Sequence, residues 1–309
     1  MKSPVSYIRL SLLVLRAVKT QAKSCIERIT EEVIKKDVFI KISKTKPIKS
    51  NVKSEIEIVS VTSHNDFYML VLGLKSLFFH SGYKFGVRVF DDGSLRLKDI
   101  DFLKSHIVGI KVVRKEEYDE RLNKYSKAFF GNKEVKDNPA VIKKLGPILF
   151  SKKIKLLFLD SDVLFFANPT FLIDWIHGKK DIIYLKDYQN AYSISNIESR
   201  KLFGVRLAPM ANTGLVGIYK HDLILTDLHK IIEFYATDGR FRLQHFQAYF
   251  AVLFSKLKSR RKIFVLPQSY LVGNPNIPIN YSQHACIHFV GLVREKYYDA
   301  ARIVLDKLT

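Results

Sequence analysis

The chain has 309 residues, of which 47% are hydrophobic and 26% charged; this is ordinary usage for a globular protein and excludes a disordered or fibrous chain. Its 51 lysines and arginines outnumber 30 aspartates and glutamates, and the net charge of +21 favours polyanionic neighbours such as nucleic acid, an acidic membrane surface or phosphorylated substrates, without choosing among them. The two cysteines, Cys25 and Cys286, are too few for a disulfide scaffold and favour a reducing compartment.

Residues 1–54 are expected to form a basic helical extension ahead of a main domain at 55–309. Two helix-like stretches, Tyr7–Ala17 and Ala22–Lys35, precede a polar basic segment at Lys41–Lys53. Such helices either lie on an anionic membrane or pack against the main domain with their charges solvated. No apolar stretch approaches the roughly 20 residues that span a bilayer, and the apolar run near the start lacks a small-residue cleavage site. The sequence favours a cytoplasmic protein and leaves a peripheral contact with an anionic membrane open.

The main domain is predicted to begin with alternating strands and helices. The expected elements are a strand at Ile56–Thr62, a helix at Tyr68–His80, a strand at Phe85–Phe90, a helix at Leu97–Ser105 and a strand at Gly109–Val113. This alternation predicts an α/β fold with a mostly parallel central sheet flanked by helices. Ligands bind beyond the carboxyl ends of the strands in such sheets, so the polar segments at 62–68 and 91–94 are candidate ligand-binding segments.

Two aspartates end the next apolar strand. Ile154–Leu159 is apolar apart from Lys155 and runs directly into Asp160-Ser161-Asp162, after which a second apolar run begins. Carboxylates flanked in this way are costly to bury unless they are paired, protonated or coordinated. Residues two apart in an extended chain project to the same side, so Asp160 and Asp162 can approach one hard cation while Ser161 points away. A plain turn is the alternative, but the apolar runs on both sides favour a site for Mg²⁺ or Mn²⁺.

The segment from Lys155 to Pro169 resembles the metal-binding segment of GT-A fold glycosyltransferases, particularly the glycogenin-like enzymes of glycosyltransferase family 8. Further segments resemble the family's elements in the family's order: Val61-Thr62 with Asn65 and Tyr68, Lys144-Leu145, Asn212-Thr213-Gly214-Leu215, and His288-Phe289-Val290-Gly291. The resemblance covers roughly Glu55 to Arg294. It implies a GT-A fold whose central sheet is mostly parallel.

The resemblance also implies roles for individual residues. It places Asp160, Asp162 and His288 around a Mn²⁺ or Mg²⁺ ion, and it implies catalytic roles for Asp160, Asp162 and Lys144. The implied donor contacts are Thr62, Asn65 and Tyr68 for the nucleoside, Lys144, Ser161, Asn212, Thr213 and Gly214 for the rest of the donor, and Gly291 with Arg294 near the diphosphate. Neutral imidazole beside two carboxylates suits Mn²⁺ somewhat better than Mg²⁺.

Several of these residues also have plainer interpretations. A lone histidine in the apolar strand Ala285–Val290 is more often a core residue than a ligand. For Arg294, the plainer interpretation is that it belongs to a solvated basic surface. Asp91 and Asp92 lie on the ligand-facing edge, where a base or ribose contact is plausible, but a simple turn explains both.

Gln247 aligns with the glutamine of the family's Asp-Gln or Glu-Gln pair, close to the transferred sugar, and is a candidate catalytic residue. The acidic member of that pair is Phe246 here, which is a departure from the family. Asp238, Gln244 or His245 are alternatives for the missing acid, and the departure leaves the acceptor and the stereochemical course open.

Taken together, the resemblance implies a metal-dependent hexosyltransferase that moves a sugar from a nucleotide-diphosphate donor, by default a UDP-hexose, to a glycan, lipid-linked or protein acceptor, with retention of configuration. The alternative is a basic nucleic-acid- or membrane-binding protein with a non-catalytic GT-A-like fold. A nucleotidyltransferase is disfavoured because residues 62–68 contain no glycine. The sequence has no helix-turn-helix, zinc-finger, RRM or KH signature, so nucleic acid is not an expected partner.

Overall fold

A computed structural model describes residues 30, 32–125, 146–238 and 245–308. The chain divides into two compact units, Met1–Lys44 and Thr45–Thr309. In the first unit residues 32–44 are helical. The predicted helix Tyr7–Ala17 and most of the predicted helix Ala22–Lys35 lie outside the described residues, so the basic extension stays a prediction.

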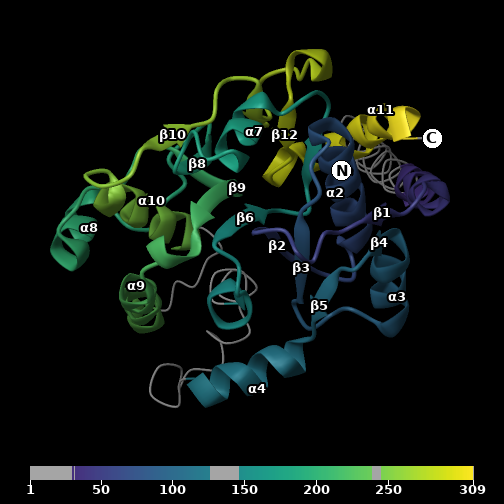
Figure 1. Cartoon of the computed structure of the whole chain (residues 1–309). Helices are drawn as coiled ribbons and strands as arrows, with labels where there is room; N and C mark the ends of the chain where they lie inside the picture. The colour runs from purple at the N-terminus through teal and green to yellow at the C-terminus, as the bar shows by residue number, and fades with distance from the viewer. Residues whose placement is uncertain (1–29, 31, 126–145, 239–244, 309) are drawn as a thin grey trace, which may run out of the picture. The chain divides into compact units, whose positions relative to one another are not determined.

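Strands and helices alternate through the second unit (Figure 1). The strands are β1 (Ile48–Lys49), β2 (Ile56–Thr62), β3 (Gly86–Asp91), β4 (Ile107–Val108), β5 (Lys111–Val113), β6 (Lys155–Leu159), β7 (Val163–Phe165), β8 (Ile182–Lys186), β9 (Ala211–Tyr219), β10 (Ile263–Val265), β11 (Tyr270–Val272) and β12 (Cys286–His288). The α-helices are α2 (Phe67–Ser81), α3 (Leu97–His106), α4 (Lys115–Tyr125), α7 (Thr170–Ile176), α8 (Asn196–Phe203), α9 (Leu225–Asp238), α10 (His245–Leu257) and α11 (Tyr297–Leu308), and the 3-10 helices are η1 (Lys220–Asp222), η2 (Tyr281–Gln283) and η3 (Gly291–Lys296). The elements predicted from sequence are present, with ends that shift by one or two residues.

The central sheet has seven strands within the described residues, in the order β10-β8-β9-β6-β2-β3-β5. Neighbouring strands are parallel except where β9 pairs with β6 and with β8, both antiparallel. The predicted α/β fold with a mostly parallel sheet is therefore confirmed. One edge of the sheet collects the carboxyl ends of the parallel strands together with the start of β9.

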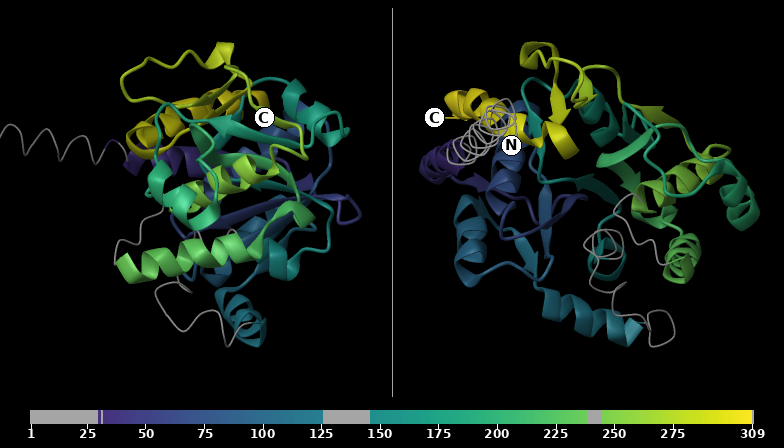
Figure 2. Two further views of the ribbon diagram at one scale, coloured as in Figure 1. Left: turned by 90° about the vertical axis from the view of Figure 1, so that its left-hand side faces the viewer. Right: turned by 180° about the vertical axis from the view of Figure 1, so that it is seen from behind.

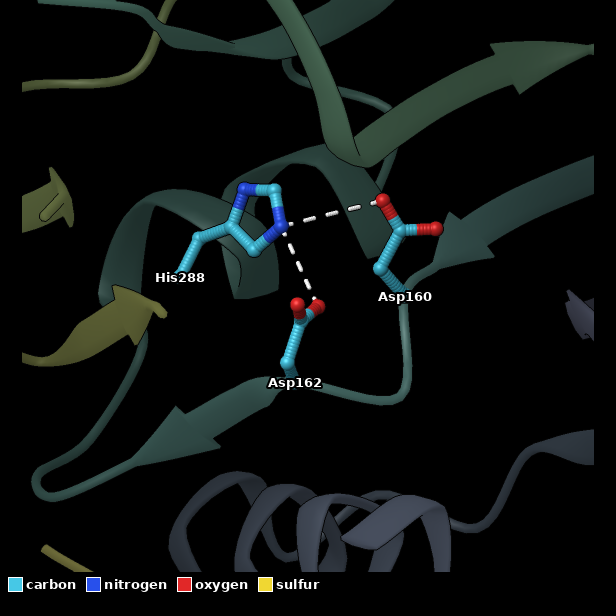
Figure 3. A group of neighbouring side chains, drawn as sticks. All are labelled: Asp160, Asp162 and His288. Atoms are coloured by element: carbon cyan, nitrogen blue, oxygen red, sulfur yellow. Dashed lines mark ion pairs between the residues drawn. The ribbon is translucent and has the colours of Figure 1, made fainter. Parts of the chain in front are cut away.

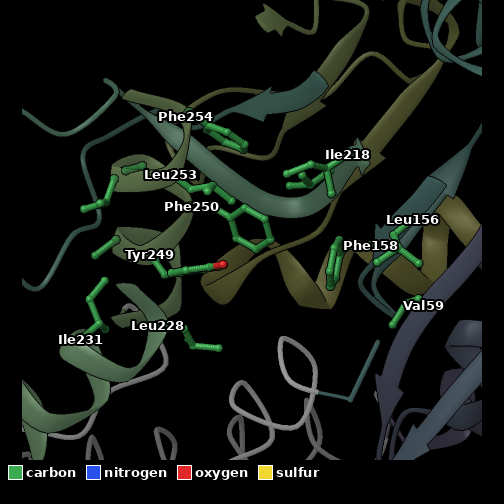
Figure 4. Close-up of a cluster of buried hydrophobic side chains, with 14 of the residues drawn as sticks. Val59, Leu156, Phe158, Ile218, Leu228, Ile231, Tyr249, Phe250, Leu253 and Phe254 are labelled. Atoms are coloured by element: carbon green, nitrogen blue, oxygen red, sulfur yellow. The ribbon is translucent and has the colours of Figure 1, made fainter. Parts of the chain in front are cut away.

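Helices cover both faces of this sheet (Figures 1 and 2). On one face, α10 packs against β9, and Phe250 of α10 meets Phe158 of β6 edge to face at 5.4 Å between ring centroids (Figure 4). On the other face, Trp175 of α7 lies so close to Gly217 of β9 that a Cβ atom there would be 2.7 Å from the indole. Burial of these aromatic rings contributes hydrophobic stabilisation on both sides of the sheet.

A three-stranded sheet, β11-β12-β7, extends beyond the carboxyl edge of β6. Strands β12 and β7 are antiparallel, with His288 opposite Val163, and the Phe289 N–H donates to the Asp162 carbonyl at 2.9 Å. Helix α2 packs against β7, and its Ser76 hydroxyl accepts a hydrogen bond from the Phe165 N–H at 3.1 Å. This small sheet fixes the position of the histidine relative to the aspartates. Within the described part of the chain, no helix combines the length and apolar character needed to cross a bilayer.

Candidate active site

Three side chains predicted as metal ligands converge at the carboxyl edge of the central sheet (Figure 3). Asp160 follows β6, Asp162 precedes β7, and His288 ends β12. His288 Nε2 lies 3.2 Å from Asp162 Oδ1 and 3.8 Å from Asp160 Oδ2. Both carboxylates therefore face the imidazole, but residues 161–162 form a turn rather than the extended backbone from which the sequence predicted this direction.

The donor set and its spacing fit a divalent cation. One ligand atom from each residue lies within 4.8 Å of the other two. Oxygen and nitrogen ligands bound at about 2.1–2.2 Å and at right angles around one ion are roughly 3 Å apart, and the imidazole Nε2 lies 3.2 and 3.8 Å from the two carboxylate oxygens. The imidazole is 4% exposed, whereas the side chains of Asp160 and Asp162 are 32% and 16% exposed. The group is thus partly exposed on the carboxylate side, where a phosphate-bearing ligand could approach.

The imidazole of His288 is held in one orientation by the start of β9. Its Nδ1 lies 2.9 Å from Asn212 Oδ1, and the same oxygen accepts the Gly214 N–H at 2.8 Å. Because an amide oxygen only accepts, Nδ1 carries a proton, and in the neutral ring the lone pair of Nε2 faces the aspartates. Gly214 leaves room for the ring: a Cβ atom there would be 2.3 Å from Nδ1. Its neighbour Thr213 is partly exposed.

Cys286, the cysteine within the described residues, does not join the group formed by Asp160, Asp162 and His288. Cys286 shares β12 with His288, yet its thiol is free and fully buried. Burial raises the pKa of that thiol far above its ordinary value, so the residue stays a neutral, inert part of the core.

The segment predicted to bind the nucleoside lies at the end of β2, beside the end of β3. Thr62 is opposite Asp91 in the parallel register and is 3% exposed, and its hydroxyl has no hydrogen-bond partner among the described residues. Asn65 is exposed. Burial, together with a 2.9 Å hydrogen bond to the hydroxyl of Tyr298, raises the pKa of Tyr68. An unpartnered buried hydroxyl is uncommon and marks a place where a ligand could donate or accept.

The two aspartates after β3 are engaged in their own turn. Asp91 Oδ1 accepts the Gly93 N–H at 2.8 Å, and its Oδ2 lies 3.2 Å from Arg114 Nε. Asp92 Oδ1 accepts both the N–H and the hydroxyl of Ser94, at 2.9 and 2.6 Å. These bonds account for both carboxylates as turn residues, and a contact with the donor stays a prediction.

Arg294 lies in η3, which Gly291 begins in the left-handed conformation at φ 60°. Its guanidinium pairs with Asp66, next to the nucleoside segment, and it also interacts electrostatically with Asp162. The cation predicted to face the diphosphate is therefore near the candidate metal site, although a carboxylate holds it. Lys144, the other predicted cation, lies outside the described residues.

One site residue was missed by the sequence reasoning. Asp187 follows β8, is 6% exposed, and accepts hydrogen bonds from Asn212 Nδ2 at 2.9 Å, Gln247 Nε2 at 2.7 Å and the Tyr188 N–H at 2.8 Å. The signal that could have found it is the one that found Asp160, a carboxylate directly after an apolar strand. The side chains of Asp238, Gln244 and His245, the sequence-based alternatives for the missing acid, lie outside the described residues, as does that of Phe246.

The sheet order, the reversed strand β9 and the small sheet carrying the histidine define the GT-A glycosyltransferase fold. The galactosyltransferase LgtC, solved in complex with donor and acceptor sugar analogs, matches 82% of this chain and 96% of its own length with a TM-score of 0.53 at 14% identity. The bifunctional glycosyltransferase WbbM, solved in the apo form, matches 85% of this chain and 51% of its own length with a TM-score of 0.55 at 14% identity. No protein-family model and no curated protein sequence matches the chain. The fold resemblance is confirmed, and membership of family 8 stays a prediction.

Proposed function

We propose that this protein is a metal-dependent glycosyltransferase that uses a nucleoside diphosphate sugar, with UDP-hexose as the default donor. The observation that carries the proposal is the convergence of Asp160, Asp162 and His288 at the carboxyl edge of a GT-A sheet. In open α/β sheets this edge is where ligands bind. Support for a sugar donor and a sugar acceptor comes from LgtC, which was solved with analogs of both.

The chemistry requires stabilisation of a departing diphosphate. A divalent cation, when bound by the two carboxylates and the imidazole, would neutralise charge on the leaving phosphates. Mn²⁺ suits this mixed nitrogen and oxygen set better than Mg²⁺. Arg294 would add positive charge once its guanidinium exchanges Asp66 for phosphate, and Lys144 is the second candidate for that role.

The other predicted contacts complete the donor site. Thr62 would use its unpartnered hydroxyl to bind the nucleoside, with Asn65 and the Tyr68 ring beside it. Asn212 and Gln247 would face the transferred sugar, and Gln247 is the residue we assign next to the reacting carbon. Retention of configuration follows from the family 8 resemblance and belongs to the proposal.

The acceptor is proposed to be a glycan, a lipid-linked saccharide or a protein, and the location cytoplasmic. The basic residues of 1–54 would favour an acceptor at an anionic membrane surface.

Metal and nucleotide binding provide the first test. We expect Mn²⁺ together with UDP to raise the melting temperature of the wild-type protein, and Asp160→Asn and Asp162→Asn to lose that shift and to lose Mn²⁺-dependent hydrolysis of UDP-sugars. Asp101→Asn, on the exposed face of α3, is the matched control and should behave as wild type. No nucleotide-dependent shift with any nucleoside diphosphate, combined with a salt-sensitive gel shift of nucleic acid, would instead establish the binding-protein alternative.

A further inference from the structure

We propose that Asp187 is a positioning residue that sets the hydrogen-bond polarity of Asn212 and Gln247 and, through Asn212, keeps Nε2 of His288 directed at the metal. The inference rests on the proposed function, because it concerns the ligand sphere of that site. Asn212 and Gln247, which are far apart in the sequence, both donate to this buried carboxylate, and His288 contacts Asn212 in turn.

The carboxylate of Asp187 fixes which end of the Asn212 amide faces it. An ionised carboxylate can only accept hydrogen bonds, whereas a carboxamide has one donating and one accepting end. Asp187 Oδ2 lies 2.9 Å from Asn212 Nδ2, so the donating end of Asn212 must point to it. The accepting end, Oδ1, is then fixed toward His288 Nδ1 at 2.9 Å.

The polarity passes from the amide to the imidazole. Because Asn212 presents an oxygen, His288 must donate from Nδ1, and the neutral ring then carries its lone pair on Nε2, beside Asp162. If the amide of Asn212 reversed, its N–H group would face Nδ1, and the ring would favour the tautomer whose Nε2 is protonated and cannot bind a cation. Groups that fix the tautomer of a ligating histidine typically affect metal affinity 10- to 100-fold.

The same oxygen of Asp187 orders Gln247. Gln247 Nε2 donates to Asp187 Oδ2 at 2.7 Å, so its carbonyl oxygen is the end left to face away from Asp187. One carboxylate therefore determines which end of both carboxamides faces the reacting sugar and the histidine.

Asp187 is suited to hold this arrangement because it is buried and fully engaged. It is 6% exposed, and its second oxygen accepts the Tyr188 N–H at 2.8 Å. Three donors offset the cost of burying the charge, and the backbone contact keeps the side chain from rotating. The Gly214 N–H, which donates to Asn212 Oδ1 at 2.8 Å, favours the same amide orientation from the other end.

The effect of Asp187 on His288 through Asn212 is tested by the affinity for Mn²⁺, measured from the electron paramagnetic resonance signal of free Mn²⁺. We expect Asp187→Ala to weaken Mn²⁺ binding about 10- to 100-fold while the protein stays folded by circular dichroism. Asp222→Ala is the matched control: this carboxylate is 7% exposed and pairs with Arg261, and its loss should lower the melting temperature without changing Mn²⁺ affinity. Wild-type Mn²⁺ affinity in folded Asp187→Ala would overturn the inference, whereas failure of the wild-type protein to bind Mn²⁺ would overturn the proposed function itself.

Exchanging the carboxylate and the carboxamide between positions 187 and 212 separates the effect of Asp187 on His288 from its effect on Gln247. This test stays informative if Asp187→Ala does not fold. Asn212→Asp alone places two carboxylates in contact and should weaken Mn²⁺ binding. The double variant Asp187→Asn/Asn212→Asp lets the new amide donate to the new carboxylate, which still accepts from His288 Nδ1. We expect it to regain Mn²⁺ affinity to within a few-fold of wild type, but not sugar transfer, because Gln247 now meets a donor and must reverse. No recovery of Mn²⁺ affinity relative to Asn212→Asp would contradict the proposal.

Discussion

Replacing Gly214 with alanine should displace the imidazole of His288 without straining the backbone. A Cβ atom at this position would lie 2.3 Å from Nδ1, 2.5 Å from Cε1 and 2.8 Å from Cγ of that ring. Non-bonded atoms of this size prefer about 3.5–4.0 Å, so the ring must move by roughly 1 Å. Metal–ligand distances tolerate only about 0.2 Å. The displacement is several times that tolerance, and the β-strand conformation of Gly214 is one that alanine adopts readily.

We therefore expect Gly214→Ala to weaken Mn²⁺ binding about 10- to 100-fold, the range seen when groups around metal ligands are changed. Isothermal titration of Mn²⁺ into the metal-free protein measures this directly. Two glycine-to-alanine variants serve as controls. Gly86→Ala would place its Cβ 3.4 Å from the nearest atom, the carbonyl oxygen of Ile56, and should leave both affinity and stability unchanged.

Gly217→Ala, in the same strand, would place its Cβ 2.7 Å from Trp175 and should lower stability without altering Mn²⁺ affinity. If Gly214→Ala binds Mn²⁺ as tightly as wild type, or loses no more affinity than Gly217→Ala does, the imidazole is not a metal ligand positioned by this strand.

Three further predictions concern the fold. Burial lowers the pKa of Lys75 from 10.5 to about 8. Between these values the unfolded chain binds more protons than the native protein, so the free energy of unfolding should rise with pH from 8 towards 10. Lys75→Met should lose this rise in thermal melts recorded across that range. Phe158→Ala, which removes a fully buried ring packed on Phe250, should lower the free energy of unfolding by about 3–5 kcal/mol in urea titrations. Because burial raises the pKa of the Cys286 thiol, a maleimide should label this residue, as mapped by peptide mass spectrometry, only after denaturant is added; labelling of the native protein at pH 8 would contradict that assignment.

The parallel half of the fold could be predicted from the sequence because its signals are local. The apolar strand before Asp160 and the helical spacing of leucines in α2 are properties of short segments. The common direction of Asp160 and Asp162 was predicted for an extended chain, whereas the structure achieves it through a turn at residues 161–162. His288 is different, since nothing in a lone histidine on an apolar strand indicates a partner more than a hundred residues away. Its assignment depended on the family resemblance, and the antiparallel pairing of β12 with β7 explains how it reaches the aspartates.

Asp187 shows where local reasoning stops. Its hydrogen bonds join the end of β8 to the start of β9 and to the first turn of α10, and such contacts between distant segments leave no periodic trace in the sequence. Because the family's acid is Phe246 here, the sequence suggested replacements near it in the chain. The carboxylate beside Gln247 is instead Asp187, which follows a different element, β8. Applying the rule about strand ends to β8 as well as to β2, β3 and β6 would have identified it.

The reversal of β9 is the topological feature on which the whole site depends. Its nine residues, Ala211–Tyr219, run antiparallel to β6 and β8, so the start of the strand, rather than its end, lies at the carboxyl edge of the sheet. At about 3.3 Å per residue, a parallel β9 over the same span would move Asn212 by six positions, roughly 20 Å, and Gly214 by two positions, roughly 7 Å, away from their places beside His288. The reversal instead brings a carboxamide that orients the imidazole and a glycine that makes room for it to the same place as Asp160, because the Asp160 N–H donates to the Gly214 carbonyl at 2.8 Å. The strand thus connects the aspartates to the histidine through its backbone and its first side chains, which is why we expect changes at its start to alter metal affinity and changes farther along it to alter stability alone.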